Sequence, residues 1–449
     1  MQFTLEAVLA LSPDDASAKA ARGLNSTSQW PTLGANAQAV WGECQGSGSK
    51  PYQTQVDLLA GPAFRCSCPS RKFPCKHGLA LLLMRCNSPA AFSATDAPAW
   101  VSGWLASRAE KAALSEQKVA TRASAPASAP EALTKRQSSE TKRWQTIQAG
   151  LEQLQLWMAD HMERGIATLS PEQRTSFQTT AARLVDAQAP GLAQRLKEAG
   201  DVIGKQPDWP ARVLHCFGNL QCIADAVARR GALPDPVLAD LKATLGWPMD
   251  KAEVLACGML LEDDFTVLGS ALQPRDAKVT ERRVWLQGQR SGQRALLLEF
   301  SHGSGSGFEG VWGVGNSYAL ALRYYPSASL LRAAVAEHQG KTTQTKPPTP
   351  EADEWLALAQ RFAQNPWLPL APMVFAQATP VYQNSAWVLH IGHTAQTTLP
   401  LRINDENGWL LAAHSGGNPV ALVGEWDGEQ LTPLTAWGLD GLWLHGVMT

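Results

Sequence analysis

Three cysteines and a histidine lie within one short stretch near the start of the chain: Cys66, Cys68, Cys75 and His77. Thiolate sulfur and imidazole nitrogen are the ligands that zinc prefers, usually four of them in a tetrahedron. Because the protein would fill all four positions, no place is left for a catalytic water. The stretch 61–86 also holds no acidic residue that could act as a general base. The sequence therefore predicts one structural Zn²⁺ ion bound by these four side chains.

The spacing of the four side chains indicates how they reach one ion. Cys66 and Cys68 are two residues apart, and such residues point to the same side of an extended segment. Cys75 and His77 are also two apart, but an apolar run follows at 79–84. On a helix, residues two apart diverge by about 200°, so we expect Cys75 just before a helix and His77 in its first turn. The alternative interpretation is a set of core cysteines or a redox pair.

Five basic residues accompany the proposed ligands: Arg65, Arg71, Lys72, Lys76 and Arg85. They could contact the phosphates of a nucleic acid or the surface of a protein partner. Local charge balance is a third interpretation, because three thiolates on Zn²⁺ leave a negative site. The chain as a whole has a formal net charge of −1, so it lacks the general basicity of a dedicated nucleic-acid binder.

The length of the chain and its cysteine content indicate how many domains to expect and in which compartment. The chain has 449 residues, more than one compact core usually holds, so we expect several domains. It has eight cysteines, three of them in the cluster and the others scattered, which is typical of a reduced, cytosolic compartment. No signal peptide is expected, because the N-terminus lacks a cationic segment. No apolar run approaches the roughly 20 residues of a membrane span, so we expect a cytoplasmic protein with no membrane partner.

Composition and periodicity divide the chain into four regions. Residues 1–106 are expected to form the zinc-binding module with a helical lead-in. Residues 107–140 predict a flexible linker, because they are rich in Ala and Ser and poor in large apolar residues. Helical spacing of apolar residues predicts a helical domain over 141–262, and short runs broken by Gly, Pro and Asn predict a β-rich domain over 263–449. The expected fold class is α+β and multidomain, with a small ββα zinc module, a helical middle region and a β-rich C-terminal region.

Other signals are weaker. Residues 305–310 satisfy G-x-G-x-x-G, but a strand-like run follows where a dinucleotide site needs a helix. His215, Cys216 and Cys222 lie in an apolar helical stretch, and we interpret the cysteines as buried helix residues. Nine tryptophans between positions 285 and 443 are expected to pack mostly in cores. Because no hydrolase elbow, metalloprotease helix or phosphate loop is present, we predict no enzymatic activity.

The pattern Cys-x-Cys-x6-Cys-x-His before an apolar helix resembles the SWIM zinc finger over roughly residues 40–86. Two phrases look like the bacterial branch of that family: Trp-Gly-Glu-Cys-Gln-Gly-Ser-Gly at 41–48 and Cys-Pro-Ser-Arg-Lys-Phe-Pro-Cys-Lys-His-Gly at 68–78. The rest of the chain is similar to the long tail of those bacterial proteins. The resemblance implies a ββα zinc-binding fold with roles in binding DNA or other proteins. It also implies genes for MoxR-type AAA+ ATPases and von Willebrand A domain proteins nearby.

The residues and the resemblance together predict a zinc-binding, non-catalytic adaptor. Its SWIM-type finger would contact a protein partner, for which the resemblance implies an AAA+ ATPase or a von Willebrand A domain protein. The alternative is a DNA-binding protein that uses the basic face of the finger, with nucleic acid as its partner.

Overall fold

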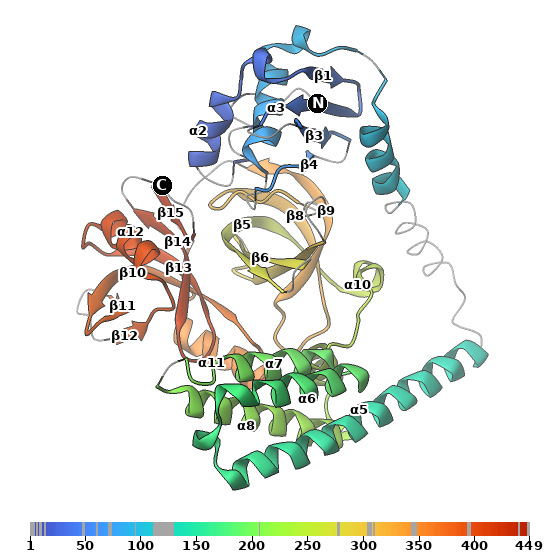
Figure 1. Ribbon diagram of the computed structural model, residues 1–449, viewed down its shortest axis with the longest axis vertical. Helices are drawn as coiled ribbons and strands as arrows, with labels where there is room; N and C mark the ends of the chain where they lie inside the picture. The colour runs from blue at the N-terminus through green and yellow to red at the C-terminus, as the bar shows by residue number, and fades with distance from the viewer. Residues whose placement is uncertain are drawn as a thin grey trace.

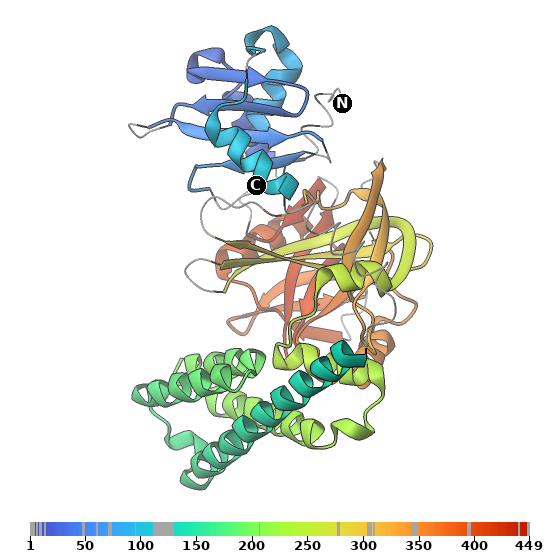
Figure 2. The ribbon, with the colours of Figure 1, turned by 90° about the vertical axis from the view of Figure 1, so that its right-hand side faces the viewer.

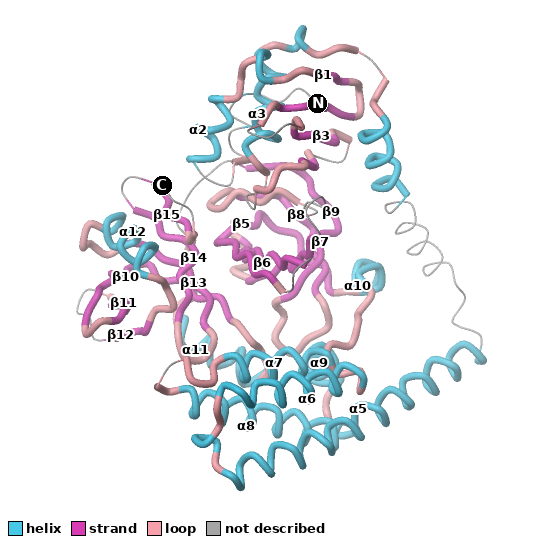
Figure 3. Tube along the Cα trace, in the orientation of Figure 1, coloured by secondary structure: helices cyan, strands magenta, loops and turns pink. Residues whose placement is uncertain are grey.

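The computed structural model shows four units along the chain (Figure 1). They are a small N-terminal module with the proposed zinc ligands, a helical bundle, a closed β-barrel and a six-stranded sheet. Five consecutive helices form the bundle, and the strands lie in the other three units (Figure 3). The predicted α+β class is therefore confirmed. The structure describes residues 5, 8, 11–12, 15–46, 50–59, 62–70, 74–94, 96–110, 130–205, 207–275, 279–302, 308, 310–342, 348–392, 397–438 and 441–446.

The N-terminal module is an antiparallel sheet covered by helices. Its elements are α2 (Asp15–Gly23), β1 (Thr32–Ala35), β2 (Ala39–Cys44), β3 (Tyr52–Asp57), β4 (Ala63–Cys66) and α3 (Lys76–Asn87). The strands follow one another in the order β1-β2-β3-β4, so the sheet is larger than the ββα unit that the resemblance implied. One side of α3 packs on β2 and β3, and α2 packs against α3 as well. As a result eight consecutive residues of α3, 77–84, are buried.

The segment after α3 returns to the module. Residues 99–110 are helical, and Val101 and Leu105 pack against Trp41 of β2. Arg108 forms an ion pair with Asp57 at the end of β3, with 3.0 Å between Nε and Oδ2. These contacts extend the core of the module to the far side of its sheet.

The predicted linker, residues 107–140, contains helix at both ends. Residues 107–110 complete the helix that packs on the module, and α5 (Pro130–Arg164) begins at Pro130. Proline suits a first helical turn because it has no N–H to leave unpaired there, and the Glu, Ala, Leu, Lys and Arg that follow favour helix. The linker boundary at 140 is therefore wrong, and residues 111–129 lie outside the described residues.

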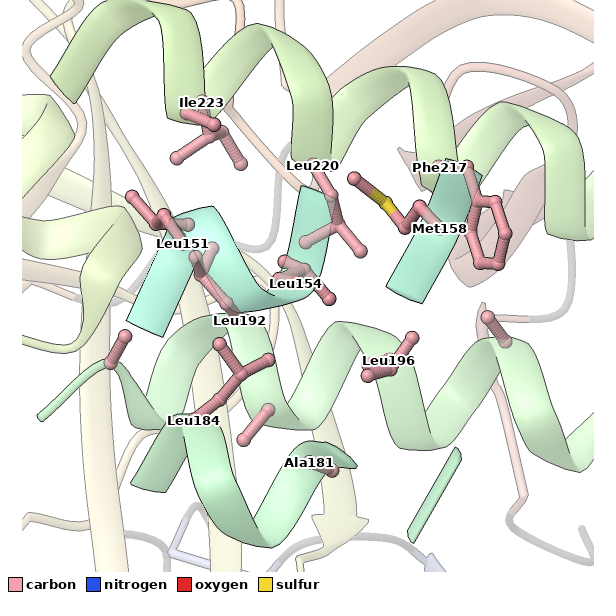
Figure 4. Close-up of a cluster of buried hydrophobic side chains, with 14 of the residues drawn as sticks. Leu151, Leu154, Met158, Ala181, Leu184, Leu192, Leu196, Phe217, Leu220 and Ile223 are labelled. Carbon is pink, nitrogen blue, oxygen red and sulfur yellow. The ribbon is translucent and has the colours of Figure 1, made fainter. Parts of the chain in front are cut away.

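The bundle consists of α5, α6 (Arg174–Asp186), α7 (Pro190–Asp201), α8 (Trp209–Ala228) and α9 (Asp235–Leu245). Helix α5 packs against α6 and α8, and α7 packs against α6, α8 and α9. Leucines at helical spacing meet in its centre (Figure 4). Ser170 and Gln173 form a capping box that opens a 3₁₀ turn before α6. The helical spacing of apolar residues on α5 continues to Met162, but only its members up to Met158 are buried, since Met162 is 53% exposed.

The barrel has five strands, β5 (Met259–Pro274), β6 (Val279–Gly288), β7 (Arg294–His302), β8 (Ser317–Tyr324) and β9 (Arg332–Thr342), and follows the short helix α10 (Lys251–Cys257). The strands close in the order β5-β6-β7-β9-β8. All neighbours are antiparallel except β7 and β9, which are parallel. This is a Greek-key barrel of the kind found in oligonucleotide-binding folds. Its interior is filled by side chains such as Phe265, Leu286 and Tyr324.

The C-terminal sheet is built from two similar halves. The first is α11 (Glu354–Gln364) followed by β10 (Ala371–Gln383), β11 (Ala386–Ile391) and β12 (Thr397–Pro400). The second is α12 (Asp405–Ser415) followed by β13 (Val420–Trp426), β14 (Leu431–Gly438) and β15 (Gly441–Leu444). The halves join through β10 and β13, which gives the order β12-β11-β10-β13-β14-β15. Both helices pack on β10.

The other face of this sheet lies against the barrel. Trp285 of β6 packs there with Val374, Val423 and Leu434. Trp367, in the loop after α11, instead enters the core of the bundle. The module, the barrel with its sheet, and the bundle thus lie one after another along the long axis of the molecule (Figure 2).

The nine C-terminal tryptophans mostly pack in cores, as predicted. The buried ones are Trp285, Trp367, Trp387, Trp437 and Trp443. Trp355 and Trp409 are exposed. Within the described residues, no helix is long and apolar enough to span a bilayer.

Candidate metal centre

The four predicted ligands converge where the sheet passes to α3. Cys66 is the last residue of β4, and Cys68 follows two residues later. Cys75 is the N-cap of α3 in an extended conformation, and His77 lies in the first turn of that helix. Both placements were predicted from the spacing. The ligand atoms of the four side chains all lie within 4.8 Å of one another.

The separations suit a tetrahedral zinc site. The Nδ1 atom of His77 lies 3.8 Å from Sγ of Cys66 and 4.0 Å from Sγ of Cys75. With Zn–S near 2.3 Å and Zn–N near 2.0 Å, neighbouring ligand atoms of a tetrahedron are about 3.5–3.8 Å apart. Nδ1 is therefore the ring nitrogen that faces the thiols. Three sulfurs and one nitrogen are the donors that zinc prefers, and together they complete its coordination shell.

Neighbouring strands orient the ligands. Thr54 of β3 pairs in register with Cys66, and its Oγ1 lies 3.2 Å from Sγ of Cys66, within hydrogen-bond distance. The ring of Tyr52, on the same strand, lies 5.0 Å from the ring of His77. Such contacts fix the direction of a ligand and tune its basicity. Gly78 allows Phe64 of β4 to approach α3, since a Cβ at that position would meet the phenyl ring.

The three thiols share protons within one network. Hydrogen bonds from Cys66 and Cys75 lower the pKa of Cys68. Hydrogen bonding to Cys68 raises the pKa of Cys66, and hydrogen bonding to Cys66 and Cys68 raises the pKa of Cys75; burial raises both further. Zinc binds thiolates, so loading the site releases protons from the cluster.

The basic residues around the site do not form one patch within the described part of the chain. Arg65 is half-buried on β4, and Lys76 is exposed at the start of α3. Arg85 lies in the last turn of α3, over the ring of Phe92 at 5.8 Å. Nine residues of helix place Lys76 and Arg85 about half a turn apart in direction and about 13 Å apart along the axis. Arg71 and Lys72 lie outside the described residues.

No second group of metal ligands converges among the residues that the structure describes. On α8, His215 is exposed and Cys216 half-buried, and burial raises the pKa of Cys216 to about 12. Cys222 is exposed, so its prediction as a buried helix residue is wrong: it lies on the solvent side of α8. Cys44 is buried on β2 but outside the ligand group. The glycine motif at 305–310 falls largely outside the described residues.

Sequence reasoning missed Thr54 and Tyr52, the residues that support the ligands. The signal available for them was the alternation of β3, which places positions 52, 54 and 56 on one side of the strand. Which of these positions lies opposite Cys66 follows only from the register of β3 with β4.

Comparison with protein families gives two matches. Residues 65–86 match the SWIM zinc finger, and residues 142–245 match the SWIM-associated four-helix bundle domain. The first match covers all four ligands, and the second covers most of α5 through α9. No curated protein and no solved structure matches the chain. The finger and its donor set assign one structural zinc ion to Cys66, Cys68, Cys75 and His77. The chain therefore carries a SWIM zinc finger at residues 65–86, followed at residues 142–245 by a SWIM-associated four-helix bundle domain.

Proposed function

We propose that this chain is a cytoplasmic, non-catalytic adaptor whose zinc module supports contacts with a protein partner. The closed donor set carries the proposal. Four protein ligands leave no open position at which zinc could activate a water or polarise a substrate. The ion therefore serves to hold β4 and α3 together, and the residues of the module supply the contacts.

The burial of α3 favours a protein partner over DNA. Zinc fingers that read DNA place a helix in the major groove, with its side chains free to reach the bases. Here residues 77–84 of α3 are buried between the sheet and α2. The helix is therefore a core element of the module, and the cations at its two ends point in different directions.

Among the described residues of the barrel, side chains on the strands expected to face a nucleic acid are covered. Greek-key barrels of this kind bind oligonucleotides across their second and third strands, which here are β6 and β7. Trp285 of β6 and Leu296 of β7 pack against the C-terminal sheet. Arg283, beside Trp285, is held by Glu425 of β13, with 2.7 Å between Nε and Oε1. Trp285, Leu296 and Arg283 are thus engaged within the chain, which argues against binding across these two strands.

The partner that the family resemblance suggests is a MoxR-type AAA+ ATPase or a von Willebrand A domain protein, and the ATPase is the one tested here. The test immobilises the full-length chain and adds the purified ATPase of the same genome after nuclease treatment, with zinc quantified in the same sample. We expect one zinc per chain and retention of the ATPase. Retention should be lost in Cys75→Ser and kept in Cys86→Ser, a cysteine of α3 outside the ligand group.

Two outcomes would overturn the proposal. If the ATPase is not retained while the chain binds DNA with a steep dependence on salt, the chain is a DNA-binding protein, which is the alternative function. If zinc content is near zero in a folded chain, the structural role of the ion is refuted.

A further inference from the structure

Three aromatic rings form a cluster where α12 crosses the β10–β11 hairpin. Tyr382 of β10 pairs in register with Trp387 of β11, and their ring centroids are 5.0 Å apart. Trp409 of α12 lies 5.3 Å from Tyr382 and 4.9 Å from Trp387. Trp387 is buried, but Trp409 is 56% exposed and Tyr382 is 41% exposed. Two large aromatic side chains in contact are thus open to solvent on one surface.

The cluster is held rigidly. Asn384 and Ser385 both have positive φ, 50° and 61°, in a two-residue hairpin turn that fixes the pairing of Tyr382 with Trp387. Residue 408 of α12 is glycine, and a Cβ at this position would meet the Trp387 indole. The glycine therefore allows α12 to lie close to β11. A surface that is ordered before binding loses little conformational entropy when a partner arrives.

Two carboxylates lie beside the exposed indole. Asp405 and Glu406 precede Trp409 by four and three residues on α12 and therefore lie on the same helical face. The indole Nε1 of Trp387 donates a hydrogen bond of 3.0 Å to Oδ1 of Asp405, which sets the direction of that carboxylate. Within the described residues, neither carboxylate has a cationic partner. The positive end of the helix dipole accounts for acids in a first turn, but it does not account for an exposed Trp409.

The charge of this unit from β10 onward points the same way. From residue 371 to the end, the chain has six acidic residues, one arginine and no lysine, a net charge of −5. The single cation, Arg402, is already paired with Asp427. This unit therefore attracts cations, although the chain as a whole is nearly neutral.

We infer that Tyr382, Trp409, Asp405 and Glu406, here called the Trp409 surface, bind a basic segment of a protein partner. An arginine or lysine of the partner lies over the Trp409 indole as a cation–π contact and places its charged group against the two carboxylates. Exposed tryptophan and tyrosine are the residues that most often dominate protein interfaces. This inference names the partner's chemistry and rests on the proposal that the chain is an interaction protein.

The test measures peptide binding directly, without the ATPase. The full-length, zinc-loaded chain is titrated into a fluorescein-labelled peptide of four Gly-Arg repeats, followed by fluorescence anisotropy, with four Gly-Glu repeats as the charge control. We expect binding of the basic peptide only, weakening as NaCl rises from about 50 to about 300 mM. Trp409→Ala should raise the dissociation constant about fivefold, the usual size of one cation–π contact.

Matched variants separate the surface from general charge. Asp405→Asn keeps an acceptor for Trp387, and Glu406→Gln keeps the side-chain shape, so both should fold normally and bind the peptide more weakly. Glu429→Gln removes an equal charge elsewhere in the unit, and Trp355→Ala removes the other exposed C-terminal tryptophan. Both should bind like the unchanged chain.

The inference is overturned if the unchanged chain does not bind the basic peptide, or if Glu429→Gln and Trp355→Ala weaken binding as much as the changes at the Trp409 surface. Peptide binding without retention of the ATPase would refute only the choice of partner made above. Retention of the ATPase without peptide binding would refute only the Trp409 surface.

Discussion

Replacing Cys75 by serine removes one zinc ligand with little other change. Cys75 is buried and is the N-cap of α3. Serine is among the best N-cap residues, and its hydroxyl can accept a hydrogen bond from the first turn of the helix. The variant therefore keeps the local shape of the helix start and isolates the contribution of the metal.

The expected loss exceeds the stability of the module. Structural zinc contributes on the order of 10–16 kcal/mol of apparent binding free energy in finger peptides, whereas whole domains are stable by about 5–15 kcal/mol. A better cap offsets only about 1 kcal/mol of the loss. The four ligands tie the end of β4 to the start of α3. Helix α3 in turn supplies six consecutive buried apolar residues, 79–84, to the module core. We therefore expect Cys75→Ser to unfold the module.

The bundle should remain folded in this variant. Its core shares no residue with the core of the module, so loss of one need not unfold the other. Hydrogen exchange with peptide resolution, together with zinc quantification, measures both units in one sample. We expect fast exchange over residues 39–87 and unchanged protection in α6 to α8, with Cys86→Ser behaving like the unchanged chain. A zinc-free Cys75→Ser chain with a fully protected module would refute the reasoning.

Two further predictions concern buried charges. Burial raises the pKa of Asp240, whose carboxylate accepts a 2.8 Å hydrogen bond from the backbone N–H of Ala328. A raised folded pKa means that stability is lost as pH rises through that pKa. Asp240→Asn should therefore slow hydrogen exchange in α9 at neutral pH, and the gain should vanish below the carboxyl's ordinary pKa, 3.8; a gain independent of pH would contradict this. Glu425 accepts hydrogen bonds from Arg283 and from Nε1 of Trp285, both at 2.7 Å. Glu425→Gln removes one of the two carboxylates that contact Arg283, which stays paired with Glu281. Because a hydrogen bond to a charged group contributes about 1.5–3 kcal/mol, the unfolding free energy in urea titration should fall by about 2 kcal/mol, and a change no larger than that of an exposed glutamate would contradict it.

The metal site could be predicted from the sequence because its geometry is local. All four ligands lie within one strand end, one short connection and one helix start. The two-residue spacings and the helix periodicity were therefore enough to place Cys75 before the helix and His77 within it. Thr54 could not be assigned in the same way, because its position opposite Cys66 depends on the register of two strands.

The barrel shows the opposite case. Its closure pairs β5 with β8, so that Asp264 lies opposite Ala319, and joins β7 to β9 in parallel. Short apolar runs indicate strands, but they hold no information on which strands pair across fifty residues. The burial of a tryptophan is equally hard to predict from the sequence. Trp285 is buried because the C-terminal sheet packs on it, whereas Trp409 is exposed.

Closeness in the sequence is also a poor guide to which residues share a surface. Lys76 and Arg85 are close in sequence, yet the turn of α3 points them in different directions. Tyr382 and Trp409 are far apart in sequence, yet hairpin and helix bring them together. The surfaces that select a partner therefore depend on tertiary structure, whereas the metal site does not.

The two ends of the chain also differ in charge. Residues 1–106 hold eight basic and six acidic residues, whereas the unit from 371 onward has a net charge of −5. An excess of two positive charges over the module, whose described basic side chains do not form one patch, selects a partner only weakly by charge. The −5 of the C-terminal unit is the stronger selector, and it favours a basic protein segment over the phosphates of DNA.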